Sequence, residues 1–579
     1  MSHPRRRVRF SDDPQLQTDA ESRPPTETAP QIPSAPSASS APPATSATSA
    51  SPCDLATGFD DIYEELEPRQ VAVISSCGFC GLIPALSKPT AVGTAIGTGL
   101  MIGTGRALSM SGPAAITISY TVVGFAVYLV LSALGEVVAW LPKPYTVADQ
   151  AVRFCDPALG FSLGWIYWLK YALVTPSQLT AAALLISYWL DPERVNPGVW
   201  ITVFLLTITV LNYLHHGLAS QVEFYVSSVK LLVMFALMIL SIIVALGGGP
   251  DQDMRGFRYW KNPGAFASRY DNSLVENLIL TCGTMSSAAF VYIGSERAGI
   301  LAQSPNVRKA ISRSTKHIFY RTLVFHLLAV ILLGMLVPHD SVSLSFHHKA
   351  SKSAAASPFV AALYLAGIPI LPDILNAFIL LFVLSTANYD LWLATKAMCD
   401  LAVKRRAPMF LSRLNKRGLP MYALAVCASV ASLAYLNVPQ DAVLMFRYLT
   451  DTVTMLGLLT WMSILFTHIS FVRARRAQGI EDSILLYRAR FGLPGTWLAI
   501  ALCLFISATM ILGSFSFDSG RIIFDYRSFV ACYIGIPIYL CLYIGHKVAR
   551  KSKRVVPSEA DLWTDKNEPS LDLQETRQE

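Results

Sequence analysis

Long uninterrupted runs of apolar residues constrain this chain more than any other feature. "VWITVFLLTITVLNYL" and "LLVMFALMILSIIVALGGG" are two of them. A helix of about 20 apolar residues crosses a hydrocarbon core about 30 Å thick. Only 15% of the 579 residues are charged and 53% are hydrophobic, whereas soluble domains carry about 25% charged residues. The sequence therefore predicts an all-α polytopic membrane protein embedded in the lipid bilayer.

Twelve membrane spans account for the apolar runs. In a bilayer every backbone polar group must be satisfied internally, so each run is expected to be a helix. The predicted spans are 85–110, 113–141, 158–189, 197–215, 222–247, 277–303, 317–338, 369–400, 420–437, 443–471, 494–515 and 527–547.

Polar tails flank the spans. Segments such as "PSAPSASSAPPATSATSASP" cannot bury enough apolar area to offset their chain entropy. We predict three parts: a disordered cytosolic N-terminal tail over 1–66, a transmembrane domain over 67–550, and a cytosolic C-terminal tail over 551–579 that is also polar and disordered. Both tails are ordinary places for the trafficking machinery to bind. No apolar segment precedes the first span, which is therefore expected to act as the targeting signal.

Basic residues cluster in alternate connections. "PRRRVRF", "NVRKAISRSTK", "VKRRAPMFLSRLNKRG", "RARRAQG" and "HKVARKSKR" all fall on one side of the membrane if there are twelve spans. Since short cytosolic connections are enriched in Lys and Arg, both termini are predicted to be cytosolic. This topology explains the net charge of +8, and no nucleic-acid partner is expected.

The chain lacks sequence signatures of catalysis. There is no HExxH, no nucleophile elbow and no phosphate-binding loop. Half of its ten cysteines lie within apolar runs, where a thiol behaves as a small hydrophobe. We therefore predict that the protein is not an enzyme and that it uses no cofactor and no metal.

Five glycines interrupt the apolar stretch "AVGTAIGTGLMIGTGRAL", namely Gly93, Gly97, Gly99, Gly103 and Gly105. Each glycine in a helix interior costs about 1 kcal/mol relative to alanine. Two explanations fit. The GxxxG spacing allows a neighbouring helix to approach closely, or the helix breaks near Gly97–Thr98–Gly99 and offers its backbone to a ligand.

Ionisable residues also occur within the spans, where they are costly and mark functional sites by default. Lys230 lies deep in its span, which favours a functional role. Lys170 is either structural or functional, and Glu136 and Glu223 lie near helix ends where a solvated carboxylate is equally expected. The complete set is Glu136, Lys170, Glu223, Lys230, Glu296, Arg297, Asp390, Arg447 and Asp451.

The sixth span has an interrupted pattern of its own. "FVYIGSERAGI" places Gly294, Ser295 and Gly299 around the charged pair Glu296–Arg297. Irregular backbone at membrane depth persists only where it is buried in protein or lines a cavity. Spans one and six occupy corresponding positions in two five-helix halves, which is the sequence pattern of a transporter binding site.

Several stretches, which follow one another in the same order along the chain, resemble fungal amino-acid permeases of the yeast amino acid transporter family, in the amino acid–polyamine–organocation superfamily. They include "IGTGLMIGTGRAL", "SGPAAITISYTVVGFAVYLVLSALGEVVAWLP", "TPSQLTAAA", "VEFYVSSVK", "GFRYWKNPGAF" and "LSTANYDLW". The resemblance implies inverted five-helix repeats with discontinuous helices 1 and 6. It also implies a secondary active transporter that imports an amino acid across the plasma membrane with a proton. The alternative is a transport-deficient amino-acid sensor of the same fold.

The resemblance also implies the site. In span one, free N–H groups would hold the substrate carboxylate, and in span six, carbonyls would accept from its ammonium. The helix-six glutamate would contact the ammonium or relay a proton. Lys230 matches the family's helix-five lysine, and a buried lysine can take up and release a proton. The implied residues are Ile96, Gly97, Thr98, Gly99, Phe290, Val291, Ile293 and Glu296 for substrate, and Lys230 for the proton.

This chain departs from the family pattern in places. Lys170 stands in helix three where the family is rich in asparagine, Arg297 replaces an apolar residue, and Asp451 replaces a helix-ten asparagine. A cationic substrate would meet Lys170 and Arg297, so lysine and arginine are not expected as substrates. The segment 76–91, "SCGFCGLIPALSKPTA", has no counterpart in the family pattern and is either a true insertion or a retained intron.

Overall fold

The fold was analysed in a computed structural model. It describes residues 97–141, 146–190, 194–214, 218–267, 273–296, 323–341, 344, 357–415, 418–438, 442–485, 487–518 and 521–563. The predicted site residue Ile96, the neighbouring Arg297, the tail 1–66 and the segment 76–91 lie outside these residues, as does the side chain of Glu223.

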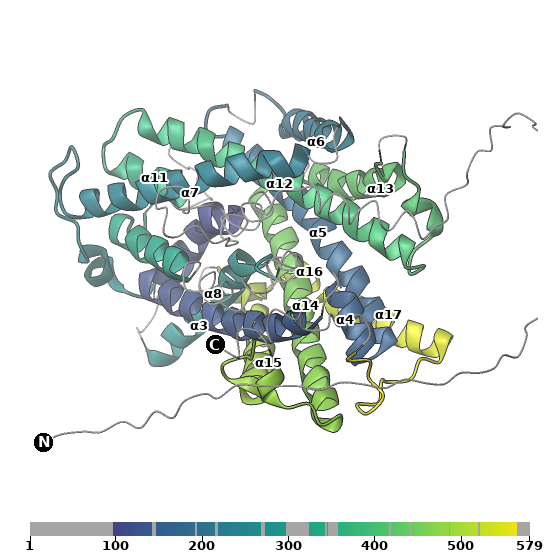
Figure 1. Ribbon diagram of the computed structural model, residues 1–579. Helices are drawn as coiled ribbons and strands as arrows, with labels where there is room; N and C mark the ends of the chain where they lie inside the picture. Colours follow the sequence, from purple (N-terminus) through teal and green to yellow (C-terminus); the bar gives the residue numbers. More distant parts are fainter. Residues whose placement is uncertain are drawn as a thin grey trace, which may run out of the picture. The chain divides into compact units, whose positions relative to one another are not determined.

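Helices make up nearly all of the described chain, as expected where lipid offers the backbone no hydrogen bonds (Figure 1). A short antiparallel hairpin pairs Phe515 with Phe524 and Asp518 with Arg521. An unlabelled helix covers Leu323–Leu336. The other elements are η3 (Gly99–Gly103), α3 (Thr104–Trp140), α4 (Val147–Phe154), α5 (Pro157–Ile186), α6 (Pro197–Leu214), α7 (Leu218–Ala245), η4 (Trp260–Gly264), α8 (Leu274–Tyr292), α11 (Pro358–Leu365), α12 (Leu371–Val403), η6 (Met409–Ser412), α13 (Met421–Ala431), η7 (Ser432–Asn437), α14 (Ala442–Ala477), η8 (Asp482–Ile484), α15 (Gly492–Thr509), η9 (Met510–Ser514), β1 (Phe515–Asp518), β2 (Arg521–Phe524), α16 (Tyr526–Tyr533) and α17 (Gly535–Arg550).

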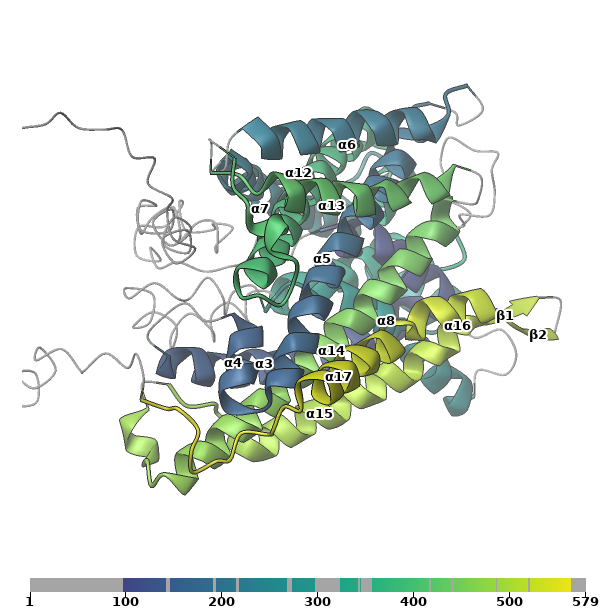
Figure 2. The same ribbon diagram turned by 90° about the vertical axis from the view of Figure 1, so that its right-hand side faces the viewer.

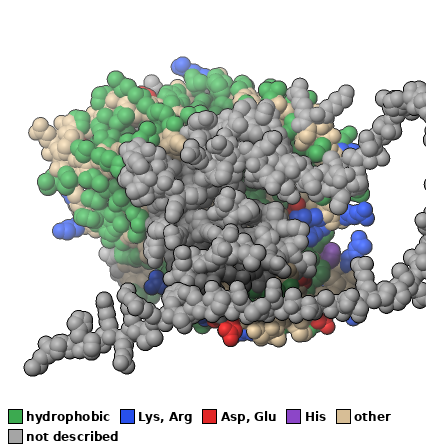
Figure 3. All heavy atoms as spheres, viewed as in Figure 1, with side chains coloured by type: hydrophobic (Ala, Val, Ile, Leu, Met, Phe, Trp, Pro, Cys, Tyr) green, Lys and Arg blue, Asp and Glu red, His purple; other side chains and the backbone are tan. Residues whose placement is uncertain are grey.

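Within the described residues, nine helices are long and apolar enough to cross a membrane, and two shorter apolar helices cover Leu323–Leu336 and Met421–Asn437. Hydrophobic side chains cover the outer surface over α6 and α7 (Figure 3). Leu206 of α6 and Leu232 of α7 are each 63% exposed. In water such a surface would be an aggregation liability, so these faces are the ones that meet lipid.

A backbone break at Gly112 divides α3. Gly112 has φ +87°, and a Cβ there would lie 2.8 Å from backbone atoms of Ala265, Phe266 and Ala267. Two hydrogen bonds clamp the break, from Ala114 N–H to the Ala265 carbonyl at 2.9 Å and from Ala267 N–H to the Ser111 carbonyl at 3.0 Å. Glycine is required here because of both the conformation and the close approach. The break falls between the predicted spans 85–110 and 113–141.

Basic connections gather at one end of the bundle, where α4 and α17 lie (Figure 2). Asp149 of α4 forms ion pairs with Lys404 and with Arg406, the latter at 3.1 Å. Asp156, which caps α5, pairs with Lys547 of α17 at 2.5 Å. Burial alone would raise the pKa of Asp149, but the Lys404 ammonium, the Thr146 hydroxyl and Arg406 together outweigh burial and lower it. The connections after α3, α12 and α17 therefore share this end.

The chain after α17 packs against the same end rather than extending as a disordered tail. Ala560 and Leu562 are 3% and 1% exposed, in a cluster with Trp140 and Phe471. Trp140 Nε1–H donates to the Leu562 carbonyl at 3.0 Å. The expectation of disorder from residue 551 is wrong for residues 551–563, because a few apolar side chains in a polar segment suffice to bury it against a prepared surface.

Replacing Leu562 by alanine should lower the melting temperature of the purified protein. Removal of a buried leucine side chain costs about 2–5 kcal/mol where the site cannot collapse. Val556→Ala in the same segment is the matched control, since Val556 is 49% exposed and should change nothing. Thermal unfolding in detergent measures both. Equal melting temperatures for the two variants would contradict the packing of this segment.

Candidate functional site

The amino end of η3 meets the carboxyl end of α8. A Cβ built at Gly99 would lie 3.0 Å from Phe290 Cδ1, Val291 Cα and Val291 Cγ2. Glycine is therefore the residue that allows these two segments, almost 200 positions apart in the chain, to touch. The two groups of residues predicted to bind substrate are brought together here.

Backbone donors are available at the start of η3. Met101 N–H donates to the Gly97 carbonyl at 3.2 Å, and the N–H groups that precede it belong to the first turn, which has no intrahelical acceptors. Thr98 is 1% exposed, and its Oγ1 has no hydrogen-bond partner among the described residues. A helix amino terminus carries partial positive charge and favours an anion.

Backbone acceptors are available at the end of α8. Ile293 N–H donates to the carbonyls of Ala289 and Phe290, at 3.1 and 3.2 Å. Gly294 follows with φ +98° and turns the chain away from the helix axis. Within the described part of the chain, the carbonyls of Val291 and Ile293 receive no backbone hydrogen bond. These oxygens lie at the negative end of the helix dipole, which favours a cation.

Helix α14 closes one side of this junction. The ring of Phe446 packs edge-on against that of Phe290, with centroids 6.5 Å apart. Further along α14, a Cβ at Gly457 would lie 2.7 Å from Ile293 Cδ1. The junction is thus bounded by η3, α8 and α14, and apolar side chains surround its few polar groups, as is common for small-molecule sites.

Glu296 lies in a fully buried ion pair with Lys170 of α5. Its Oε1 also faces the Tyr171 hydroxyl at 3.4 Å. Its Oε2 accepts from Trp461 Nε1–H at 3.1 Å and from Gly294 N–H at 3.0 Å. Because both oxygens are engaged, Glu296 fixes the turn after α8 to helices α5 and α14. The pair also cancels the charge that Lys170 would otherwise present to a substrate.

Lys170→Met should destabilise the protein strongly. Removing one partner of a buried ion pair leaves an uncompensated charge and costs about 3–5 kcal/mol. The double variant Lys170→Met/Glu296→Gln removes both charges and should recover most of the loss. Melting temperatures of the single and double variants measure this coupling, and equal losses in both would show that the pair is not held as described.

Lys230 is fully buried in the middle of α7. Its Nζ donates to Thr386 Oγ1 of α12 at 3.0 Å, and that hydroxyl donates to the Phe382 carbonyl at 2.8 Å. The structure places Lys230 between two spans, away from the surface that meets lipid.

Three of the remaining charged residues, Glu136, Arg447 and Asp451, have partners either far away in sequence or on the same helix. Glu136 is 2% exposed, so a solvated carboxylate is the wrong interpretation. Its Oε2 lies 3.3 Å from Nε2 of His468 in α14 and accepts from Ala489 N–H at 2.8 Å. Arg447 and Asp451 pair along α14 at 3.5 Å.

Sequence reasoning missed several residues of these clusters. Tyr171, Trp461 and His468 lie within apolar helices. Nothing in their local pattern separates a polar edge that meets a carboxylate from ordinary aromatic packing. Their roles depend on contacts between helices that are far apart in the chain.

Known proteins resemble this chain over most of its length. The amino acid permease family matches residues 90–557. The chain is 39% identical over 478 residues to the dicarboxylic amino acid permease of Saccharomyces cerevisiae, covering 82% of this chain and 78% of that protein. It is 38% identical over 516 residues to an uncharacterized amino-acid permease of Schizosaccharomyces pombe, covering 87% and 94%. The general amino-acid permease of Saccharomyces cerevisiae is 31% identical over 488 residues, covering 83% and 79%.

A match of this extent includes the predicted substrate residues from Gly97 to Glu296 and every helix described above. The earlier resemblance is confirmed. The chain therefore belongs to the amino acid permease family and is a multi-pass membrane transporter of amino acids, not an enzyme.

Proposed function

We propose that this permease imports its amino acid together with a proton across the plasma membrane. The observation that carries the proposal is the junction of η3 and α8 at Gly99. A zwitterionic amino acid needs a donor-rich end for its carboxylate and an acceptor-rich end for its ammonium. The first turn of η3 and the last turn of α8 offer those two ends side by side.

The proposed substrate site follows the predicted residues. Ile96, Gly97, Thr98 and Gly99 would hold the carboxylate. Main-chain carbonyls would hold the ammonium, with those of Val291 and Ile293 best placed since they have no other described backbone donor. Phe290 would contact the substrate with its ring, and Glu296 would fix the turn after α8 through its four donors.

The proposed proton site is Lys230. Its ammonium donates a hydrogen bond to Thr386 of α12, so uptake or loss of a proton would change the contact between α7 and α12. Coupling requires that protonation and substrate binding favour the same conformation. A lysine buried between two helices is suited to this role because its charged form depends on the polar partners around it.

We propose twelve spans in two inverted five-helix repeats followed by two further helices, with helices 1 and 6 discontinuous. The nine long helices give ten spans when Gly99–Trp140 is divided at Gly112, and the two shorter apolar helices bring the number of spans to twelve. We assign the discontinuity of helix 1 to the glycines at Gly97 and Gly99, and that of helix 6 to the turn after Tyr292, where α8 ends. The transmembrane domain would cover 67–550, between tails at 1–66 and 551–579.

Both termini are proposed to be cytosolic, where the trafficking machinery can reach the tails. The connections after α3, α12, α14 and α17 lie at one end of the bundle with many basic residues. On the opposite end, Thr202 at the start of α6 meets Tyr435 of η7 at 2.7 Å. Successive connections alternate between the two sides of the membrane, and an even number of spans puts both termini on the same side. Lys and Arg mark the cytosolic side.

Acidic amino acids are the first substrates to test, since a relative bears the name of a dicarboxylic amino acid permease. Uptake of labelled acidic, neutral and basic amino acids by cells that express the chain should be saturable and faster at external pH 5 than at pH 7. Binding by the purified protein without uptake would instead support a transport-deficient sensor. Uptake that ignores both pH and a protonophore would contradict proton coupling.

A further inference from the structure

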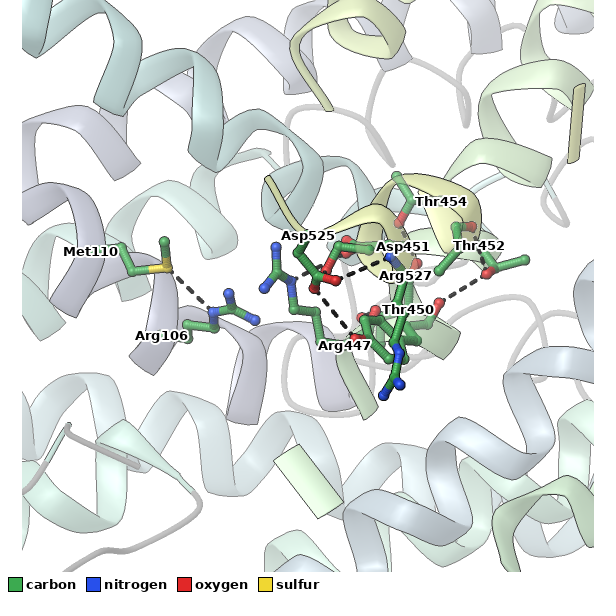
Figure 4. Close-up of polar contacts among 12 residues, drawn as sticks. Arg106, Met110, Arg447, Thr450, Asp451, Thr452, Thr454, Asp525 and Arg527 are labelled. Atoms are coloured by element: carbon green, nitrogen blue, oxygen red, sulfur yellow. Dashed lines mark hydrogen bonds and ion pairs between the residues drawn. The ribbon is translucent and has the colours of Figure 1, made fainter. Parts of the chain in front are cut away.

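Two guanidinium groups lie close together beside the junction, at the end of the bundle that carries the β1–β2 hairpin. Arg106 of α3 and Arg447 of α14 point toward each other in Figure 4, with Asp451 and Asp525 nearby. Arg447 and Asp451 are 17% and 15% exposed, so solvent reaches them only in part. We call Arg106, Arg447 and Asp451 the arginine cluster.

Positive charge exceeds negative charge in the arginine cluster. Arg447 Nε lies 3.5 Å from Asp451 Oδ2. Arg106 Nε donates to Met110 Sδ at 3.2 Å, and among the described residues no carboxylate lies within ion-pair distance of it. Arg106 feels the repulsion of Arg447 and the attraction of Asp451. Two cations thus share one anion, in surroundings where solvent screens charge poorly.

Two further charged side chains, Asp525 and Arg527, lie near the arginine cluster (Figure 4), and among the described residues neither forms an ion pair with it. Asp525 caps α16, and its carboxylate accepts from Arg527 N–H at 3.0 Å, Ser528 Oγ–H at 2.6 Å and Tyr448 O–H at 3.3 Å. The Arg527 side chain turns to the Tyr526 hydroxyl, 3.3 Å from its Nε. Asp525 keeps its negative charge, but its hydrogen bonds go to α16 and to the Tyr448 hydroxyl, and among the described residues no ion pair joins it to Arg106 or Arg447.

The arginine cluster adjoins the proposed substrate site. Phe446, whose ring covers Phe290, directly precedes Arg447. Arg106 lies seven residues beyond Gly99 on the same helical segment, about 10 Å along its axis. A guanidinium stands at the end of a long side chain and presents several donors in a fork that matches a carboxylate. A substrate carboxylate that points from the junction toward this end would meet the cluster.

We propose that Arg106 and Arg447 form the subsite that receives the side-chain carboxylate of an acidic amino acid. Asp451 holds Arg447 in place and offsets part of its charge, so that one carboxylate from the substrate completes the balance. The proposal rests on the proposed function, since it takes the α-carboxylate and ammonium to be bound between η3 and α8. It names the residues that make an acidic side chain preferable to a neutral one.

The test compares substrates that differ only in charge. Uptake of labelled glutamate and glutamine, and of aspartate and asparagine, is measured for each variant as initial rate against concentration, normalised to protein at the membrane. Arg447→Gln and Arg106→Gln should each lower the preference for the acid over its amide by about tenfold or more, as expected for loss of a charge-assisted pair. Asp451→Asn should change the preference in the opposite direction, because it leaves Arg447 uncompensated.

Arg527→Gln is the matched control, because its side chain turns to Tyr526 and should leave the preference unchanged. Arginine variants that alter uptake of acid and amide by the same factor, or an Asp451→Asn variant that lowers the preference, would overturn the proposal. If the arginine variants fail to fold, the Asp451→Asn result still decides. If the unaltered protein transports neither member of a pair, or transports without a proton, the proposed function fails instead, and that failure is visible before any variant is compared.

Discussion

Gly99→Val is expected to abolish most of the amino-acid uptake of this permease. The added Cβ would lie 3.0 Å from Phe290 Cδ1 and from both Cα and Cγ2 of Val291. One of these atoms is main chain and cannot move aside without displacing the end of α8. Overpacking of this kind costs about 1–3 kcal/mol, which corresponds to roughly 5- to 150-fold in a rate or binding constant.

A neighbouring glycine supplies the control for this experiment. A Cβ at Gly103, which lies outside the proposed substrate site, would meet no atom within 4 Å among the described residues, so Gly103→Ala should retain uptake. Initial rates of uptake are divided by the amount of protein at the membrane for each variant. A Gly99→Val protein that reaches the membrane and transports normally would show that the junction is not the substrate site.

Lys230→Met should uncouple transport from the proton gradient. A thioether cannot bind a proton, whereas the lysine amine can. The variant should therefore stop concentrating amino acids and equilibrate them at most, while exchange of labelled for unlabelled substrate continues. Accumulation in proteoliposomes with an acidic outside buffer, with and without a protonophore, measures this loss.

Lys230→Arg separates charge from proton transfer at the same position. Arginine keeps a positive charge but does not release its proton in proteins. We expect this variant to bind substrate and to lose net accumulation, as the methionine variant does. Undiminished, protonophore-sensitive accumulation by both variants would place the coupling group elsewhere in the chain.

Much of the fold follows from the sequence because lipid leaves the backbone few options. Each apolar run of adequate length had to be a helix, and the position of Gly112 matches the boundary drawn between the first two predicted spans. The segment 551–563 was misjudged because its burial depends on Leu562 meeting a surface made by Trp140 and Phe471. The amino-acid composition of the segment itself does not reveal whether such a surface exists elsewhere in the fold.

Only part of the candidate site could be predicted from the sequence. Glycine spacing and the resemblance pointed to Gly99 and to the end of α8, and the structure brings these together. Glu296 was read beside its sequence neighbour Arg297, yet its ion-pair partner is Lys170, which lies 126 positions earlier. Partners across helices are set by packing, so a charged residue in a span indicates that a polar cluster exists but does not identify the other residues in it. Arg106 went unnoticed because it follows a glycine-rich stretch rather than interrupting an apolar one.

A structure of the protein with a bound amino acid tests the central claim most directly. The substrate is expected between η3 and α8, with its carboxylate within hydrogen-bond distance of the Thr98 hydroxyl and the N–H groups around Gly99. Its ammonium is expected at the carbonyls of Val291 and Ile293. A substrate found elsewhere in the bundle, with Gly99 still packed against Phe290 and Val291, would contradict the assignment of the site.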